Sequence, residues 1–343
     1  MNKLVVIDGS ALLSHHFYGN VPMAYRMAKT PEEKEIHLKN IMRTSDGRPI
    51  NGLFGFMRAL LNMMNEVNPT HLAIAWDITR DTFRRDLYPE YKATRSASPE
   101  ELIEQYHLSQ KTFRSMGIPQ FWSENYEADD YVGSLANKFE SDLEVSIWTK
   151  DQDSLQLLSD QTNVWYITKK AEDMYEEIID DMDIAIEDIV APRGVFVYTP
   201  MALEHFYGLA PEQIIDLKGL EGDSSDNIPG VKRIGNKMAV LLLQKFGTTE
   251  EVFAAVKKYP EKEMRAMLKE IGATRAYKPL IAEYEDGNNA EYFAGLSKKL
   301  ATIVTDIEEV MELDLDDLAY EVDEDLCADV LYDLEMKTLV KLL

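Results

Sequence analysis

Cysteine is almost absent from this chain: its 343 residues contain one, Cys327. A single cysteine excludes an internal disulfide framework and a zinc site built on several thiolates. Long hydrophobic runs are also lacking, since no stretch approaches the ~18 apolar residues that a membrane span needs. The apolar run at residues 4–7 is too short for the core of a signal peptide. We therefore expect a cytoplasmic protein.

Positive charge is scarce. The chain has 36 Lys and Arg against 61 Asp and Glu, and a net charge of −25 argues, as an average, against nucleic-acid binding. The acids are unevenly distributed, however, because residues 171–191 hold nine of them and residues 300–336 hold fourteen, with no Lys or Arg in either segment. Such blocks are usually solvated faces or tails. Outside these blocks and the acids of a candidate metal cluster, the chain is moderately basic.

The remaining composition is that of a folded protein. Apolar residues make up 45% of the chain and aromatic residues 10%, and this length suggests roughly two domains. Short apolar runs that predict strands lie at residues 4–8, 71–77, 118–122, 145–149, 163–168 and 194–198. Helical spacing is found at residues 51–66, 99–116, 128–139 and 153–158. This alternation predicts an α/β domain over residues 1–199, with a mostly parallel sheet that is buried on both faces.

Some segments do not follow this alternation. Residues 78–116 begin with many Arg and Lys and few apolar anchors, which is typical of a long excursion over the ends of a sheet. Residues 171–193 are an acidic insertion between two predicted strands. From residue 200 the pattern is helical to residue 343, and its last forty residues are acidic and amphipathic. We expect this tail to form helices that pack on the body.

Acidic residues recur where the predicted strands end and the following helices begin. They are Asp8, Asp77, Glu127, Asp129, Asp130, Asp151 and Asp153. Ligands of parallel α/β sheets bind outside the carboxyl ends of the strands, so we expect these acids to converge at one edge. Asp223 and Asp226 lie in a Gly/Pro-rich loop that could close over that edge.

Each of these acids has a simpler interpretation as a helix cap or turn residue. Capping needs one acid per helix, however, and not two or three. Several carboxylates that converge would repel one another unless cations relieve the repulsion. An all-oxygen ligand set favours Mg²⁺, with Mn²⁺ as the alternative. Spare carboxylates beyond the needs of one ion suggest two ions, which can activate water and stabilise the leaving oxygen of a phosphoryl displacement.

Three segments together resemble the signatures of the 5′-nuclease family. They are residues 126–130 (YEADD), 149–158 (TKDQDSLQLL) and 222–231 (GDSSDNIPGV). The family includes the N-terminal nuclease domain of bacterial DNA polymerase I, stand-alone phage 5′-exonucleases and eukaryotic flap endonuclease. The resemblance runs, with gaps, from about residue 4 to residue 247, and the motifs taken jointly in this order are highly specific.

This resemblance implies a fold and a metal site. The fold is a PIN-like three-layer α/β/α nuclease domain with a helical arch over the site, followed by a helix–three-turn–helix module that grips duplex DNA in residues 200–343. The first metal site would be formed by Asp8, Asp77, Glu127 and Asp129. The second would be formed by Asp129, Asp151, Asp153 and Asp223. Asp130 and Asp226 would lie nearby.

The resemblance also implies the residues that contact the substrate. In the arch segment, Lys92 and Arg95 would offset charge at the scissile phosphate, Arg84 would hold a neighbouring phosphate and Tyr91 would stack on a base. A solvent-exposed basic helix is the alternative interpretation of this segment.

The segment 230–239 resembles the phosphate-binding turn of the helix–three-turn–helix. Its expected contacts with nucleic acid are Gly230, Lys232, Arg233, Gly235 and Lys237. A K⁺ ion is a further candidate ligand there. Glycine spacing of this kind, taken alone, is more often an ordinary turn.

The chain departs from the family pattern at two places. Ser14-His15 stands where an aromatic–arginine pair is usual, and Arg233 replaces the first glycine of the Gly-x-Gly turn. In addition, about twenty residues at 19–43 and the acidic insertion have no assigned counterpart in the family.

The expected activity is that of a structure-specific 5′-3′ exonuclease and flap endonuclease. Its substrates would be DNA with 5′ flaps, nicks or free 5′ ends, and RNA–DNA primers, in replication or repair. We expect a monomer whose acidic segments contact a replication protein, in the host cytoplasm if a phage encodes it. The alternatives are a non-catalytic relative that binds branched DNA and a single-strand ribonuclease of the wider PIN group.

Overall fold

A six-stranded sheet forms the centre of this computed structural model, which describes residues 2–182, 189–285 and 287–343. The strands are β1 (Lys3–Asp8), β2 (His71–Ala75), β3 (Gln120–Phe121), β4 (Glu144–Thr149), β5 (Thr162–Ile167) and β6 (Val195–Tyr198). Their order in the sheet is β3-β2-β1-β4-β5-β6. Neighbours from β3 to β5 are parallel, and β6 runs antiparallel to β5. The predicted mostly parallel sheet is confirmed.

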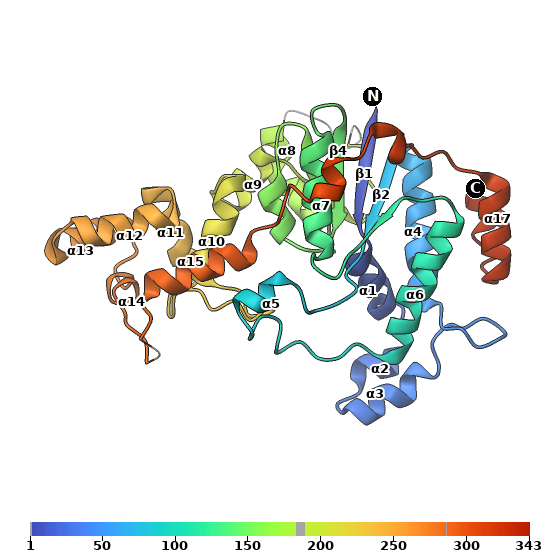
Figure 1. Cartoon of the computed structure of the whole chain (residues 1–343), viewed down its shortest axis with the longest axis horizontal. Helices are drawn as coiled ribbons and strands as arrows, with labels where there is room; N and C mark the ends of the chain where they lie inside the picture. Colours follow the sequence, from blue (N-terminus) through green and yellow to red (C-terminus); the bar gives the residue numbers. More distant parts are fainter. Residues whose placement is uncertain (1, 183–188, 286) are drawn as a thin grey trace.

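Helices cover both faces of the sheet (Figure 1). One face packs against α1 (Gly9–Gly19), α4 (Asn51–Val67) and α6 (Glu100–Ser115), and the other against α7 (Ala128–Phe139), α8 (Ala171–Met182) and α9 (Pro200–Tyr207). The side chains of β1 alternate between these two cores: Val5 and Ile7 belong to the first, and Leu4 and Val6 to the second. This alternation follows from the two-residue period of a strand, and it produces the expected three layers.

A separate helical region has its own core and extends to the left in Figure 1. Its elements are η3 (Pro211–Gln213), α10 (Ile214–Glu221), α11 (Asn236–Phe246), α12 (Thr249–Lys258), α13 (Glu261–Glu270), α14 (Tyr277–Leu280) and α15 (Ala290–Ala301). Leu217, Leu242 and Phe253 are among the residues buried between these helices. The predicted change to helical structure after residue 200 is therefore observed.

The acidic tail packs on the α/β body, as its amphipathic pattern predicts. Its elements are α16 (Glu308–Met311), η4 (Leu315–Asp317), α17 (Glu324–Asp333) and η5 (Val340–Leu342). Val310 lies in the core beneath α7, and Cys327 and Leu331 lie in the core beside α4 and α6. The predicted second domain, residues 200–343, therefore differs from the structure in its last part. The apolar side chains of residues 303–343 are buried against the first domain and not the second.

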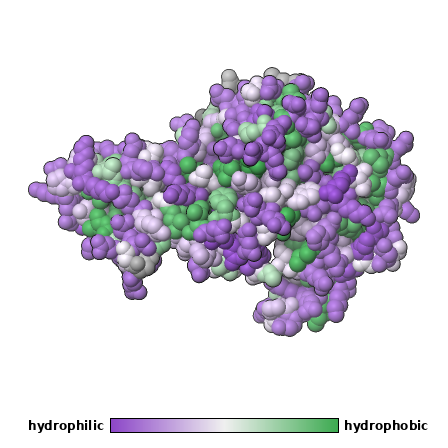
Figure 2. Space-filling model, in the orientation of Figure 1, coloured by the Kyte–Doolittle hydropathy of each residue, from purple (hydrophilic) through white to green (hydrophobic). Residues whose placement is uncertain are grey.

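Two further segments shape the region around the site. Residues 19–43 contain α2 (Met23–Met27) and α3 (Pro31–Leu38), which form the lobe at the bottom of Figure 1. Hydrophobic atoms are visible on this lobe in Figure 2, and the side chains of Met23 and Met27 are 67% and 74% exposed. Residues 78–99 contain one five-residue helix, α5 (Phe83–Leu87), followed by turns. The expected arch over residues 78–116 is thus not a continuous helical span, and α6 packs on the body.

Residues 153–157 and the described start of the acidic insertion form helices. The helical spacing at residues 153–158 forms the 3-10 helix η1 (Asp153–Leu157). In the acidic insertion, α8 ends at Met182, and the acids at positions 183, 187 and 188 lie outside the described residues. No helix in the described part of the chain is long and apolar enough to cross a membrane.

Candidate metal and nucleic-acid site

The predicted carboxylates gather at the carboxyl edge of the sheet. Asp8 is the last residue of β1, Asp77 follows β2 by two residues, and Asp151 follows β4 by two. Asp8 also caps α1, because its Oδ1 accepts a hydrogen bond from the Ala11 amide at 2.9 Å. Asp77 Oδ1 likewise accepts from the amide of Ala128, the first residue of α7, at 2.9 Å. These acids therefore both cap helices and lie close together. Each lies at the end of a strand, where the following helix begins, and the strand ends meet at this edge of the sheet.

Burial and mutual repulsion dominate a first group of carboxylates, which consists of Asp8, Asp77, Asp129 and Asp151. Burial, followed by the charges of Asp77 and Asp151, raises the pKa of Asp8 to about 7. The pKa of Asp129 is raised well above its ordinary value by burial and by Asp151, Asp8 and Asp77. Asp129 Oδ1 is buried and has no hydrogen-bond partner among the residues described. A carboxylate oxygen in this state is costly to ionise unless a cation approaches it.

The second group contains a lysine that sequence reasoning missed. Lys218, in α10, places its Nζ 2.7 Å from Asp153 Oδ1 and also contacts Asp223 Oδ2. Burial raises the pKa of Asp223, but hydrogen bonds from Lys218 and Ser225 outweigh it and lower that pKa to about 2. Burial and the charge of Asp151 raise the pKa of Asp153 to about 6 in spite of Lys218. The feature of the sequence that could have indicated this contact is the position of Lys218, near the end of α10 and five residues before Asp223.

Arg84 corrects one prediction. It was expected to hold a phosphate, but the residue is only 2% exposed and makes two 2.7 Å hydrogen bonds to the carboxylate of Asp130. The amides of Glu127 and Val304 also donate to this carboxylate, so both Asp130 oxygens are fully used and neither is left for a metal ion. This arrangement ties α5 to the start of α7, and the expected metal role of Asp130 is not supported.

Tyr91 corrects another prediction, because it is 3% exposed and cannot stack on a base in this arrangement. Its hydroxyl lies 3.1 Å from Glu127 Oε2 and 3.3 Å from Asp226 Oδ2, so its single proton is shared between the two carboxylates. Lys92 Nζ lies 2.9 Å from Glu127 Oε2, and Arg95 forms an ion pair with Asp226. Because of these contacts, residues 88–95 pack against the carboxylates and do not project from the site as an arch.

Lys92 and Arg95 nevertheless face open space near the first carboxylate group. A pocket of about 570 Å³ is lined by Asp77, Lys92, Arg95, Glu127 and Ser14, among others. Burial opposes the charge of Lys92, but Glu127, Asp226 and Asp77 outweigh it and raise the lysine pKa, so this side chain is charged at neutral pH. The pocket thus places positive charge opposite Asp77, where a phosphate could lie between them.

The donor set fits divalent metal ions, although no three or more acidic, His or Cys side chains among the described residues already form a metal-binding group. The best-suited oxygens belong to Asp8, Asp77, Asp129 and Asp151, which repel one another and include the unpartnered Asp129 Oδ1. Asp153 and Asp223 would become available if Lys218 moved away. The partition into two sites, with Glu127 in the first, stays a prediction.

The predicted phosphate-binding turn lies on the surface of the helical region. Lys232, Arg233 and Lys237 are exposed, and Gly235 precedes α11 with open space where a side chain would stand. Gly230 differs, because a Cβ there would lie 2.3 Å from the backbone nitrogen of Gly222. Its role in the structure is close backbone packing, and its expected contact with nucleic acid stays a prediction.

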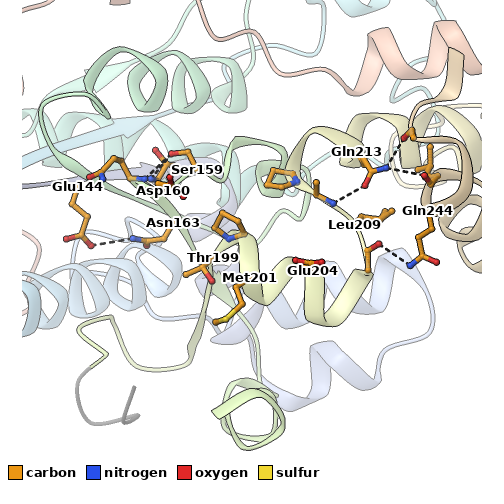
Figure 3. Close-up of a pocket in the computed structure, with 18 residues that line it drawn as sticks. Glu144, Ser159, Asp160, Asn163, Thr199, Met201, Glu204, Leu209, Gln213 and Gln244 are labelled. Atoms are coloured by element: carbon orange, nitrogen blue, oxygen red, sulfur yellow. Dashed lines mark hydrogen bonds between the residues drawn. The ribbon is translucent and has the colours of Figure 1, made fainter. Parts of the chain in front are cut away.

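A larger pocket lies away from the carboxylates (Figure 3). Its volume is about 920 Å³, and its lining includes Glu144 at the start of β4 and Asn163 near the start of β5. Because these strand starts are at the opposite edge of a parallel sheet, the pocket is remote from Asp8 and Asp151. It has acidic residues in its lining and no Lys or Arg, so it is unsuited to phosphate.

Comparison with known proteins agrees with this geometry. Two family models match, one described as the 5′-3′ exonuclease N-terminal resolvase-like domain over residues 3–183, and the other as the 5′-3′ exonuclease C-terminal SAM fold over residues 209–325. A DNA polymerase I of Bacillus caldotenax is 37% identical over 320 residues, which are 93% of this chain and 30% of that protein. The chain thus spans under a third of that relative.

A stand-alone relative is covered more fully. The 5′-3′ exonuclease of Bacillus subtilis (strain 168) is 34% identical over 263 residues, or 76% of each chain. Among solved structures, the bacteriophage T5 D15 flap endonuclease, in a pseudo-enzyme-product complex with DNA and metal ions, has a TM-score of 0.58 and 17% identity, covering 97% of this chain and 100% of that one. At that identity the likeness shows the fold. The sequence matches and the fold together establish that this chain belongs to the 5′-3′ exonuclease family.

Proposed function

We propose that this protein is a divalent-metal-dependent 5′-3′ exonuclease and flap endonuclease that hydrolyses phosphodiester bonds of DNA. The observation that carries the proposal is the group of mutually repelling carboxylates at the carboxyl edge of the sheet, with the buried and unpartnered Asp129 Oδ1 at its centre. Carboxylates that lack partners in this way fit hard cations. Mg²⁺ is the proposed ion, and Mn²⁺ is an acceptable substitute.

The metal ions would be held by Asp8, Asp77, Asp129 and Asp151, joined by Glu127, Asp153 and Asp223. When bound, such ions supply an activated water and stabilise the leaving oxygen. The residues of the chain do the positioning. Lys92 and Arg95, at the wall of the 570 Å³ pocket, would hold the scissile phosphate beside Asp77 and offset its developing charge.

Binding of the duplex is assigned to the turn before α11. Lys232, Arg233 and Lys237 would contact backbone phosphates without reading sequence, so affinity should fall with salt. The N-terminus of α11, reached through the open space at Gly235, favours an anion. K⁺ binding at this turn, RNA–DNA primers as substrates, and contact of the acidic segments with a replication protein are further parts of the proposal.

The test is cleavage of end-labelled flap, nicked and RNA-primed duplexes with and without Mg²⁺, followed by sizing of the products. Asp77→Asn and Asp151→Asn should abolish cleavage while binding persists, and each amide keeps an oxygen for the local hydrogen bond. Asp142→Asn, at an exposed position just after the C-terminal end of α7, is the matched control and should cleave normally. Undiminished turnover by either site variant would contradict the metal assignment, and binding without cleavage by the unmodified protein would favour a non-catalytic relative.

A further inference from the structure

A second, positively charged pocket adjoins the carboxylates on a different side from Lys92 and Arg95. It has a volume of about 490 Å³, and its charged lining consists of Arg26, Lys150, Lys169 and Asp151, with His15 beside them. Four parts of the chain meet there: α1, α2, the end of β4 and the end of β5. In a chain whose net charge is −25, a pocket with three bases and one acid is a local reversal of charge.

The bases of this pocket are free to act on a ligand. Arg26, Lys150 and Lys169 are exposed, and none of them forms an ion pair with a carboxylate in the described ranges. Burial, followed by the charges of Lys150 and Lys169, lowers the pKa of His15, so the two ammonium groups and the imidazole ring are near neighbours. Cations placed close together repel one another, and an anion between them would relieve that repulsion.

Arg26 is held in place by its own segment of the chain. Its Nη2 donates a hydrogen bond to the carbonyl oxygen of Gly19, at the end of α1, and another at 3.4 Å to that of Tyr18. Arg26 belongs to α2, within the residues 19–43 that have no assigned counterpart in the family pattern. A segment without an assigned counterpart in the family pattern therefore brings a guanidinium group to the edge of the site.

The pocket adjoins the proposed cleavage site. Asp151 lines it, and Ser14 lines both this pocket and the one that contains Asp77, Lys92 and Arg95. The two pockets therefore flank the carboxylates. His15, Arg26, Lys150 and Lys169 form what we call the Arg26 pocket. We propose that this pocket binds a phosphate group of the strand being cut. Asp151 lies between this phosphate and the one held by Lys92. This inference rests on the proposed nuclease function and adds a binding subsite to it.

The test measures binding of a fluorescent flap duplex by anisotropy in EDTA, where cleavage is stopped, over a range of salt concentrations. Arg26→Ala and Lys169→Ala should each weaken binding about three- to tenfold and reduce the slope of log Kd against log salt by about 1. Arg26→Lys should recover part of the affinity because it keeps the charge. Lys39→Ala is the matched control, because this substitution also removes one positive charge. Lys39 lies in the same segment as Arg26, is exposed and does not line the pocket.

Two substrates identify which phosphate is bound. If the pocket holds a terminal phosphate, Arg26→Ala should weaken binding of a 5′-phosphorylated strand and not that of a 5′-hydroxyl strand. If it holds an internal phosphate, both should weaken equally. Since Arg26 also holds the end of α1, Lys169→Ala must show the same pattern for a direct contact. Unchanged affinity and salt slope in both variants, with normal cleavage by the unmodified protein, would overturn the subsite alone. Failure of the unmodified protein to cut any duplex would instead overturn the proposed function.

Discussion

The ammonium group of Lys218 lies 2.7 Å from the carboxylate of Asp153, and it contacts Asp223 at the same time. Both acids are predicted ligands of the second metal ion. Lys218 therefore neutralises, from within the chain, carboxylates that a divalent ion would otherwise neutralise. An ion that binds both acids must displace this lysine or share them with it.

Replacing Lys218 tests that relationship. In Lys218→Met, two partly buried carboxylates lose their counter-charge, so we expect the metal-free protein to be destabilised by roughly 1–3 kcal/mol. Divalent ions should bind more tightly because they no longer compete with the lysine. Thermal unfolding in EDTA and calorimetric titration with Mn²⁺ measure the two effects, and Lys299→Met, at an exposed position in α15, is the control. Equal Mn²⁺ affinity in Lys218→Met and the unmodified protein would refute the competition.

Arg84 should matter for stability first. Arg84→Met leaves the fully buried Asp130 carboxylate without its partner, and breaking such a pair costs about 3–5 kcal/mol. Arg85→Met is the matched control. The side chain of Arg85 is partly exposed and pairs with Asp81, so it should contribute less than about 1 kcal/mol to the free energy of unfolding. Urea unfolding measures both. A stable Arg84→Met protein with weakened DNA binding would instead restore the phosphate-binding role that the sequence predicted.

The carboxylate cluster should make metal-free stability depend on pH. The pKa of Asp8 is raised to about 7 and that of Asp153 to about 6, so the folded state holds these protons more tightly than the unfolded state does. The contribution of these two groups to the free energy of unfolding is therefore greatest at low pH, and it falls as the pH rises from about 4 to about 7. We expect the melting temperature in EDTA to fall over this range.

Two measurements separate this effect from general pH dependence. Added Mg²⁺ should raise the melting temperature more at pH 8 than at pH 5, because the ion binds the ionised carboxylates. Asp8→Asn should flatten the pH profile while keeping the cap on α1, since an asparagine oxygen accepts the same hydrogen bond. An identical profile in Asp8→Asn would show that Asp8 is not the responsible group.

Arg233 occupies a backbone conformation that favours glycine, with φ of 72°. Arg233→Gly should therefore stabilise the protein by about 1 kcal/mol, while its lost charge weakens DNA binding and lowers the salt slope. Lys232→Gly removes the same charge at a neighbouring residue whose φ is not positive, so it should destabilise by roughly 0.5–1 kcal/mol. Melting temperature and Kd at two salt concentrations distinguish the pair. Destabilisation by both variants would contradict the strain at Arg233.

The order of strands and helices could be predicted from the sequence because it depends on local periodicity. Residues 4–7 of the first strand are continuously apolar because both faces of a parallel sheet are covered, and helix α7 was predicted with its observed bounds. The gathering of Asp8, Asp77 and Asp151 at one edge followed from the parallel direction of their strands. For the same reason, the family motifs pointed to the correct part of the molecule.

Only the tertiary structure decided how each charge is used. Arg84 and Arg85 are adjacent in sequence and alike in chemistry, yet one is buried against Asp130 and the other is partly exposed. Lys218 meets Asp153 across 65 positions of the chain, and α17 packs beside α6 although the two helices are far apart in sequence. Local pattern fixes which residues are charged or apolar, but the partner of a buried charge is set by distances between remote segments, and those distances exist only in the folded chain.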